Sequence, residues 1–375
     1  MSRVALSALL AVAAVAVAQD PTGTEPLADK RFTYPTGIPY QVDPNMGVRG
    51  AQNGYNLCNS TTENQASLCQ TAFINHIDDW CVWAPPTGPT TIGESEGQEV
   101  AWCTKPGRGT RLIPQGAITG VQFLRAKSYL EVIAFLDQTM LNLAADDYGG
   151  ELDPHGADLR GNPLGGLVFS NGLPLSGTGD NNTYDQVIEW HNFIGSNFSC
   201  FKACDPQDPN DHNYCYNQLD RVGIEYVCPN QAQNHVFEVC DSDNQDYPGV
   251  YTLSDGTTTS YTQPPESLGA ITSMPYTARV PASSNCVTYQ SSDLFPSLPT
   301  PTNVPATSAG ASGSAGPAAT GKAGASASAS GSASRSGSAG AAPTGGSSLT
   351  GGAASLRTSA FATIAGVVVA VAFFA

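Results

Sequence analysis

The chain has 375 residues, including 39 glycines, 27 prolines and ten cysteines, and its formal net charge is −16. The acidic excess lies in residues 32–300, where 29 Asp and Glu stand against 10 Lys and Arg, a net charge of −19. A field of this sign repels nucleic acid and anionic membranes, so it excludes nucleic-acid binding and favours a neutral partner, such as a glycan, or a cationic one.

The N-terminus predicts export. Residues 1–18 place Arg3 before an apolar run that ends in small residues, which is the layout of a secretory signal peptide. Residues 19–31 are short, polar and end in Lys30-Arg31. We expect them to form a propeptide that a kexin-type protease removes, which would make Phe32 the mature N-terminus. The alternative is an ordinary exposed basic pair.

The cysteines predict a disulfide framework. In a secreted chain an even number of cysteines indicates disulfides, here up to five, and the spacing does not reveal their pairing. Four cysteines precede the gap between Cys103 and Cys200 and six follow it, which permits two bridges in one part and three in the other. Zinc is the competing interpretation, but no CxxC pair occurs, and we expect no metal and no cofactor. The cysteines are Cys58, Cys69, Cys81, Cys103, Cys200, Cys204, Cys215, Cys228, Cys240 and Cys286.

The first part of the folded region is expected to be extended and then helical. Residues 32–55 are interrupted by prolines and glycines, which predicts turns. Ser60-Thr61-Thr62-Glu63 has the pattern of a capping box, and Cys69, Phe73, Ile77 and Trp80 follow at helical spacing. This pattern predicts a helix over residues 63–80.

The next segment contains Gly93-Glu94-Ser95-Glu96-Gly97, formally the G-x-S-x-G pattern of hydrolases. A nucleophile elbow needs a strand before it and a helix after it, whereas a Pro/Gly/Thr run precedes this pentapeptide, so we interpret it as a solvated acidic loop. Residues 99–103 and 120–124 are predicted strands. Residues 128–143 suit either a strand or a helix, and the alternation of Leu130, Val132, Ala134 and Leu136 favours the strand.

A loop rich in glycine spans residues 148–169, YGGELDPHGADLRGNPLGGLVF, inside the gap that lacks cysteines. Its six glycines allow backbone angles and close approaches that other residues do not. Beyond it, residues 186–194 alternate as a strand. Residues 213–222 predict a short helix that stops at Gly223, and turns and short strands follow up to Cys286. We therefore predict a mainly β, disulfide-stapled globule over residues 32–300, sandwich-like, with one or two short helices.

The C-terminus predicts a stalk and a lipid anchor. Residues 306–355 are almost entirely Ala, Ser, Gly, Thr and Pro, so we expect a disordered, O-glycosylated stalk over residues 301–345 that reaches roughly 40 Å. Residues 346–375 have the layout of a GPI-attachment signal, with Gly346 as the attachment residue and an apolar tail over 360–375. The tail is short for a membrane-spanning helix, which is the alternative.

The N-glycosylation sequons lie at Asn59, Asn181 and Asn197.

Candidate catalytic groups gather in and near the glycine-rich loop. Glycoside hydrolysis needs two carboxylates held across a sugar, one protonated and one ionised. The opposing interpretation is that Asp153-Pro154 and Asn162-Pro163 are turn formers and that loop carboxylates are solvated. We therefore interpret the chain as non-enzymatic, with catalysis as the alternative. The candidate residues are Glu151, Asp153, His155, Asp158 and Glu189, together with His191.

The sequence also contains candidate residues for two other kinds of site. Asp153, His155 and Asp158 are metal-type ligands, and residues 241–246 resemble a calcium loop, but Asp246 occupies the position that requires glycine. Glycan binding would use aromatic faces, although aromatic residues in a stapled domain mostly form its core. Its candidates are Trp80, Trp83, Trp102 and Trp190, with many tyrosines.

Several strings resemble a fungal family of macrophage-activating glycoproteins over most of residues 32–290. They are FTYPTGIPYQVD, CTKPGRGTRLIP, YGGELDPHGADLRGNPLGG, VIEWHNFIG and ESLGAITSMPYTARVPASSNCVT. The resemblance implies a secreted or wall-associated glycoprotein that stimulates host immune cells, and it implies no catalytic residue. We therefore expect a GPI-anchored cell-surface glycoprotein that contacts wall polysaccharide or a host receptor, and meets the membrane only through its lipid.

Overall fold

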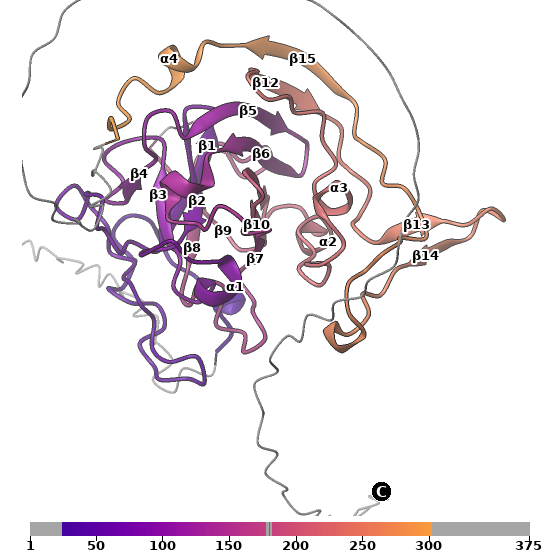
Figure 1. Ribbon diagram of the computed structural model, residues 1–375, viewed down its shortest axis with the longest axis horizontal. Helices are drawn as coiled ribbons and strands as arrows, with labels where there is room; N and C mark the ends of the chain where they lie inside the picture. Colours follow the sequence, from indigo (N-terminus) through magenta and orange to yellow (C-terminus); the bar gives the residue numbers. More distant parts are fainter. Residues whose placement is uncertain (1–24, 178–179, 181, 302–375) are drawn as a thin grey trace, which may run out of the picture. The chain divides into compact units, whose positions relative to one another are not determined.

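The computed structural model describes residues 25–177, 180 and 182–301, which form two sheets and a small hairpin (Figure 1). The six-stranded sheet has the order β4 (Arg111–Leu112), β3 (Val100–Cys103), β2 (Asp79–Ala84), β1 (Thr71–His76), β8 (Leu167–Ser170) and β9 (Asp185–Val187). The seven-stranded sheet has the order β15 (Ser283–Thr288), β12 (Phe237–Ser242), β5 (Ile118–Arg125), β6 (Tyr129–Leu136), β11 (Phe198–Cys204), β10 (Trp190–Gly195) and β7 (Gly150–Leu152). The hairpin pairs β13 (Val250–Thr252) with β14 (Thr258–Ser260).

The core lies between the two large sheets. Alternation along β10 turns Trp190, Asn192 and Ile194 toward the six-stranded sheet, as the sequence predicts. There the Trp190 ring lies 5.8 Å from that of Trp83 in β2, and the Trp83 backbone N–H donates to Asn192 Oδ1 at 2.9 Å. The mainly β, sandwich-like prediction is confirmed.

The helices are short. The described residues contain α1 (Ile92–Ser95), α2 (Asp211–Tyr214), α3 (Ile224–Val227) and α4 (Ser291–Leu294), with 3₁₀ turns η1 (Leu27–Asp29), η2 (Gln138–Leu141) and η3 (Glu266–Leu268). No helix in this part of the chain is long and apolar enough to cross a membrane. The number of short helices exceeds the one or two predicted.

The predicted helix over residues 63–80 is wrong. The segment from Thr71 instead forms β1, which turns back into β2, and both strands are buried on both faces. A central strand buried on both faces is continuously apolar, so its aromatic and β-branched residues matched helical spacing by coincidence. Glu63 caps no helix, because its Oε2 accepts from the backbone N–H of Gly107 at 2.6 Å.

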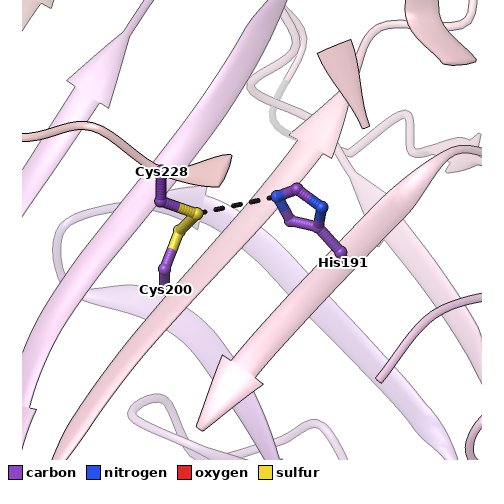
Figure 2. Close-up of side chains that lie close together, drawn as sticks. All are labelled: His191, Cys200 and Cys228. Atoms are coloured by element: carbon purple, nitrogen blue, oxygen red, sulfur yellow. Dashed lines mark hydrogen bonds between the residues drawn. A yellow bond between two sulfur atoms is a disulfide. The ribbon is translucent and has the colours of Figure 1, made fainter. Parts of the chain in front are cut away.

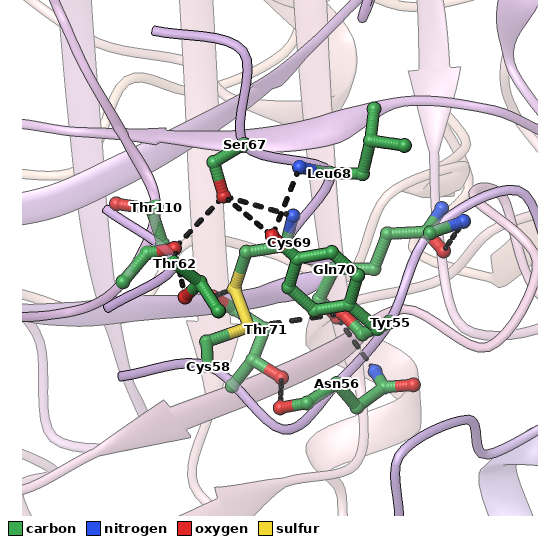
Figure 3. Close-up of a disulfide and its surroundings, with 12 residues drawn as sticks. Tyr55, Asn56, Cys58, Thr62, Ser67, Leu68, Cys69, Gln70, Thr71 and Thr110 are labelled. Carbon is green, nitrogen blue, oxygen red and sulfur yellow. Dashed lines mark hydrogen bonds between the residues drawn. A yellow bond between two sulfur atoms is a disulfide. The ribbon is translucent and has the colours of Figure 1, made fainter. Parts of the chain in front are cut away.

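Cys69 is held beside this hairpin by a polar cluster around the disulfide to Cys58 (Figure 3). Tyr55 Oη lies 3.2 Å from Ser67 Oγ, and Asn56 Nδ2 donates to the Gln70 carbonyl at 2.8 Å. The second of these bonds satisfies the Gln70 carbonyl, in the turn-rich segment before β1 that has no ladder partner over most of its length.

Two further expectations need correction. The predicted helix over residues 213–222 is limited to α2 and ends at Cys215, which is tied to Cys204 in β11. The expected acidic loop over residues 93–97 begins as α1, and buried Ser95 donates its hydroxyl to Glu99 Oε1 at 2.6 Å. The strands predicted at 99–103, 120–124 and 128–143 correspond to β3, β5 and β6, with η2 after β6.

All ten cysteines form five disulfides, which confirms the disulfide framework. Two bridges lie before the cysteine-free gap and three after it, and no described cysteine is free. The pairs are Cys58–Cys69, Cys81–Cys103, Cys200–Cys228, Cys204–Cys215 and Cys240–Cys286. Cys200–Cys228 and Cys204–Cys215 fasten residues 205–228 to β11, and Cys240–Cys286 joins β12 to β15 within the seven-stranded sheet.

The predicted processing site is packed into the fold. Leu27 is buried and its backbone N–H donates to the Leu159 carbonyl at 2.8 Å. The Gln186 side-chain amide binds the backbone on both sides of Arg31. Its Nε2 donates to the Lys30 carbonyl at 3.1 Å, and its Oε1 accepts from Phe32 N at 2.6 Å. Cleavage after Arg31 stays a prediction.

The signal peptide, stalk, Gly346 and Asn181 lie outside the described residues; Asn59 and Asn197 are exposed.

Candidate functional site

The glycine-rich loop carries the chain from one sheet to the other. Its first part is β7, an edge strand paired with β10, and its last part is β8. Between them, Asp153 and Asn162 exchange backbone hydrogen bonds of 2.8 and 2.9 Å. Gly149 shows why glycine is needed, since a Cβ there would lie 2.0 Å from the Ile194 carbonyl oxygen. The loop is therefore shaped by its packing against β10.

Two candidate carboxylates hold this loop together. Asp153 Oδ1 accepts from the backbone N–H groups of His155 at 2.7 Å and of Gly156 at 2.9 Å. Asp158 pairs with Arg49, whose Nε donates to Oδ2 at 3.0 Å. Asp153 is thus a turn former, as the alternative to catalysis proposed, but it is buried and not solvated, and Asp158 is an ion-pair partner of Arg49.

His155 and Glu189 form an ion pair that faces solvent. His155 Nε2 lies 2.9 Å from Glu189 Oε2, and their side chains are 25% and 13% exposed. The hydrogen bond to Glu189 raises the pKa of His155, with burial acting in the opposite direction. The predicted strand over 186–194 is divided in the structure into β9 in one sheet and β10 in the other. Glu189 lies between these two strands, where the chain crosses from one sheet to the other.

Glu151 differs from the other candidates because its carboxyl is enclosed. Neither oxygen has a hydrogen-bond partner among the described residues, and Oε1 lies 3.5 Å from His191 Nδ1 without hydrogen-bond alignment. Burial, followed by the charge of Asp153, raises the pKa of Glu151 well above its ordinary value. Burial also lowers the pKa of His191 well below its ordinary value, so burial favours the neutral form of both groups.

Replacing Glu151 by Gln should raise the melting temperature, and by more at about pH 8 than at about pH 5. A carboxyl whose pKa is raised in the folded state stabilises the fold at low pH, and that contribution is lost as the pH rises through the folded pKa. Glutamine does not ionise, so the variant escapes the loss. Thermal unfolding of both proteins at the two pH values measures the difference. A gain that is larger at the lower pH would contradict the assignment.

The loop forms one wall of a pocket of about 1050 Å³. The other wall comes from residues 212–221, which the Cys204–Cys215 disulfide holds against the sheet. Burial raises the pKa of Glu96 at this pocket, and the charges of Asp153 and Asp220 add to the shift while Arg49 opposes it. The carboxylates that line the pocket are Glu96, Glu151, Asp153, Glu189, Asp220 and Glu266, and the basic groups are His155, His212 and Arg221.

The structure thus brings together four of the six predicted candidates, Glu151, Asp153, His155 and Glu189. Asp158 and His191 do not line the pocket. The opposite wall, with Tyr216, Asn217 and Asp220, was missed. Only the pairing of Cys204 with Cys215 could have indicated it, and cysteine spacing does not reveal pairing.

The tryptophans do not form a glycan platform. Their side chains are packed in the hydrophobic core, which corrects the aromatic candidates for sugar binding. The exposed fractions are 0% for Trp80 and Trp83, 4% for Trp102 and 1% for Trp190.

Among the described residues, two groups of side chains lie as close together as metal ligands do, but both contain a disulfide. In one, His191 Nε2 lies 3.6 Å from Cys228 Sγ, which is bonded to Cys200 (Figure 2). In the other, Glu238 lies beside the Cys240–Cys286 disulfide. A disulfide sulfur is not a thiolate, the form in which cysteine binds zinc, so neither group has the donor set of a metal site.

Comparison with known proteins places the chain among fungal proteins. It is 36% identical to the appressorium protein ROW2 of Mycosarcoma maydis over 272 residues, which are 72% of this chain and 86% of ROW2. The chain belongs to the same family as ROW2. It is also 41% identical to the appressorium protein ROW1 of the same fungus over 203 residues, 54% of this chain and 46% of ROW1. No family model and no solved structure matches.

The family membership bears on the expected function only in part. Relatives that are appressorium proteins agree with a fungal cell-surface protein. The resemblance to macrophage-activating glycoproteins is not addressed by these relatives and stays a prediction.

Proposed function

We propose that the protein is a secreted, GPI-anchored glycoprotein of the fungal cell surface whose acidic pocket binds wall polysaccharide, with a preference for sugar units that carry amino groups. The observation that carries the proposal is the acidic excess of the pocket lining, six carboxyl groups, of which Glu151 is enclosed, against one arginine and two histidines. An ammonium group is the natural complement of such a lining. Carboxylates held close together in a partly buried space repel one another, and a cation that enters the pocket reduces this repulsion.

The groups open to a ligand support a glycan in particular. Glu189 and His155 are partly exposed, and Asp220 is exposed on the opposite wall. Tyr216 and Asn217 lie on that wall as well. Carboxylates accept hydrogen bonds from hydroxyl and ammonium groups, an amide both donates and accepts, and an aromatic ring packs on the apolar face of a sugar ring.

The arrangement supports binding rather than hydrolysis. A glycosidase needs two carboxyl groups that both reach the glycosidic bond. Asp153 and Asp158 are engaged in the loop's own hydrogen bonds, and the Glu151 oxygens are enclosed. We therefore propose a non-enzymatic role.

Hydrolysis is the second candidate, and one observation favours it. Glu151 lines the pocket with a pKa raised well above its ordinary value by burial, as a general acid requires. An acid in this role would need the pocket to open toward its carboxyl. If the second candidate holds, wall polysaccharide incubated with the protein releases soluble sugar, and Glu151→Gln abolishes the release.

We also propose an immunomodulatory role in which a host receptor recognises the protein. The resemblance to macrophage-activating glycoproteins supports it, and glycans attached at exposed Asn59 and Asn197 would be the natural recognition elements. Recognition that persists after enzymatic deglycosylation would contradict that part of the proposal.

The full secreted chain, incubated with insoluble glucan, chitin, mannan and partly deacetylated chitin, tests the proposed function. We expect retention that is greatest on deacetylated chitin, no released sugar, and loss of retention as salt rises. Glu189→Gln should weaken retention, whereas Asp293→Asn, which removes an exposed charge outside the pocket, should not. Equal retention on all four polymers, or none, would refute the preference for amino groups.

A further inference from the structure

A second pocket, of about 790 Å³, lies in the disulfide-fastened part of the chain, in residues 214–279. Its lining differs from that of the acidic pocket because tyrosines predominate. They come from α2, α3, the turn before β13, β13 itself and the segment before β15. The five tyrosines are Tyr214, Tyr226, Tyr247, Tyr251 and Tyr276, and each is partly exposed.

These rings hold one another in fixed orientations. Tyr251 and Tyr276 stack with ring centres 4.8 Å apart and planes 4° from parallel, and Tyr226 meets Tyr276 edge-on at 5.3 Å. Tyr276 Oη accepts from the backbone N–H of Gly249 at 2.9 Å, which orients that ring. Rings that are already oriented lose little conformational entropy on binding, which favours a ligand with a flat apolar face.

Polar groups of balanced charge complete the lining. Arg279 and Asp246 form a two-point pair, with Nη2–Oδ1 at 2.7 Å and Nε–Oδ2 at 3.0 Å. Gln245 is 4% exposed, and its Oε1 accepts from Lys202 Nζ at 2.6 Å. The Gln245 Nε2 donor has no hydrogen-bond partner among the described residues. A buried donor without a partner is costly, and a ligand or water that accepts from it would relieve the cost.

We propose that this tyrosine pocket binds a neutral oligosaccharide. Pyranose rings present an apolar face to aromatic rings and a rim of hydroxyl groups that both donate and accept. The lining offers both kinds of partner, because Asp246 accepts and Arg279 donates. A proline-rich peptide also packs on tyrosines, but its prolines only accept, so they could use the donors of the lining and would leave the remaining acceptor capacity of the Asp246 carboxylate unused.

The proposal is independent of the acidic pocket. Tyr214 lines one pocket and Tyr216 the other, and Cys215 between them is fixed to β11 by its disulfide. The chain would therefore contact a wall at two sites with different chemistry. Two linked sites on one polymer raise the overall affinity above that of either site.

Titration calorimetry with the full secreted chain tests the proposal. The probes are neutral hexasaccharides of β-1,3-glucose, β-1,4-glucose and N-acetylglucosamine, with decaproline as the competing ligand. We expect at least one hexasaccharide to bind, Tyr251→Ala to weaken it by about 3- to 10-fold, and Tyr251→Phe to leave it unchanged. Glu189→Gln, in the acidic pocket, should have no effect here. If Tyr251→Ala does not fold, as judged by near-UV circular dichroism, Tyr226→Ala replaces it because it lies on a different segment.

Several results of this titration would contradict binding of a neutral oligosaccharide in the tyrosine pocket. Absence of binding by every neutral hexasaccharide, unchanged affinity of the folded alanine variant, or binding of decaproline alone would overturn the proposal. Loss of hexasaccharide binding in Glu189→Gln with none in Tyr251→Ala would place the sugar in the acidic pocket instead.

Discussion

Lys202→Met should lower the free energy of unfolding by about 3–5 kcal/mol, the largest loss expected from a single substitution in this chain. Lys202 is fully buried on β11, and Nζ lies 3.2 Å from Glu131 Oε2, directly across on β6. The same Nζ donates to the Val227 carbonyl at 2.7 Å. Methionine fills the space but leaves the Glu131 carboxylate buried without its counter-ion. Urea unfolding with the disulfides intact measures the change.

The matched control removes both charges. Lys202→Met combined with Glu131→Leu should recover at least half of the loss, because replacement of a whole buried ion pair by apolar groups is far less costly than removal of one partner. The Val227 carbonyl remains without its donor, so recovery should be incomplete. A double variant as unstable as Lys202→Met would show that the ion pair is not the source of the effect.

Removing the Cys200–Cys228 disulfide, by alanine at both positions, should cost about 3–4 kcal/mol, from the loop of 28 residues that it closes. Its sulfurs lie in the second hydrophobic cluster with Ile133, Phe193 and Leu219, so the cost in packing adds to that in chain entropy. We expect the tyrosine pocket to loosen as well, since Tyr226 lies two residues from Cys228. Urea unfolding and hydrogen exchange of β11 and α3 measure the two effects.

Removing Cys58–Cys69 in the same way is the control for that prediction. Its loop is shorter, at 11 residues, and it lies before β1, away from both pockets. We expect it to destabilise the fold without changing exchange in α3. Equal effects of the two removals on α3 would contradict a specific role of Cys200–Cys228.

Much of the fold could be predicted from alternation along single strands. β6 is an example, because Leu130, Val132 and Ala134 face the sandwich core while residues between them face the other way. Alternation fails where apolar side chains fill both faces of a strand, as in β1 and β2, and helical spacing there wrongly predicted the helix over 63–80.

The second hydrophobic cluster, which contains Cys200 and Cys228, could not be predicted from the sequence for a different reason. Glu131, His191 and Lys202 alternate with apolar residues, which normally indicates a solvent-facing side. In the structure residues 205–236 and 243–280 cover that side, held to β11 by two disulfides, and bury the charges. The same cover supplies the second wall of the acidic pocket and all five tyrosines of the other. Half of the candidate site could be located from the glycine-rich loop, and the remainder depended on disulfide pairing.

The central claim is that the acidic pocket recognises amino groups on a polysaccharide, and its most direct test is a titration of the full secreted chain with a glucosamine hexamer and with its fully N-acetylated counterpart. We predict tighter binding of the hexamer that carries free amines, and a loss of about tenfold or more in the Glu189→Gln/Asp220→Asn double variant, because each lost carboxylate removes a charge-assisted hydrogen bond. Equal affinity for the two hexamers, with no change in the double variant, would contradict it.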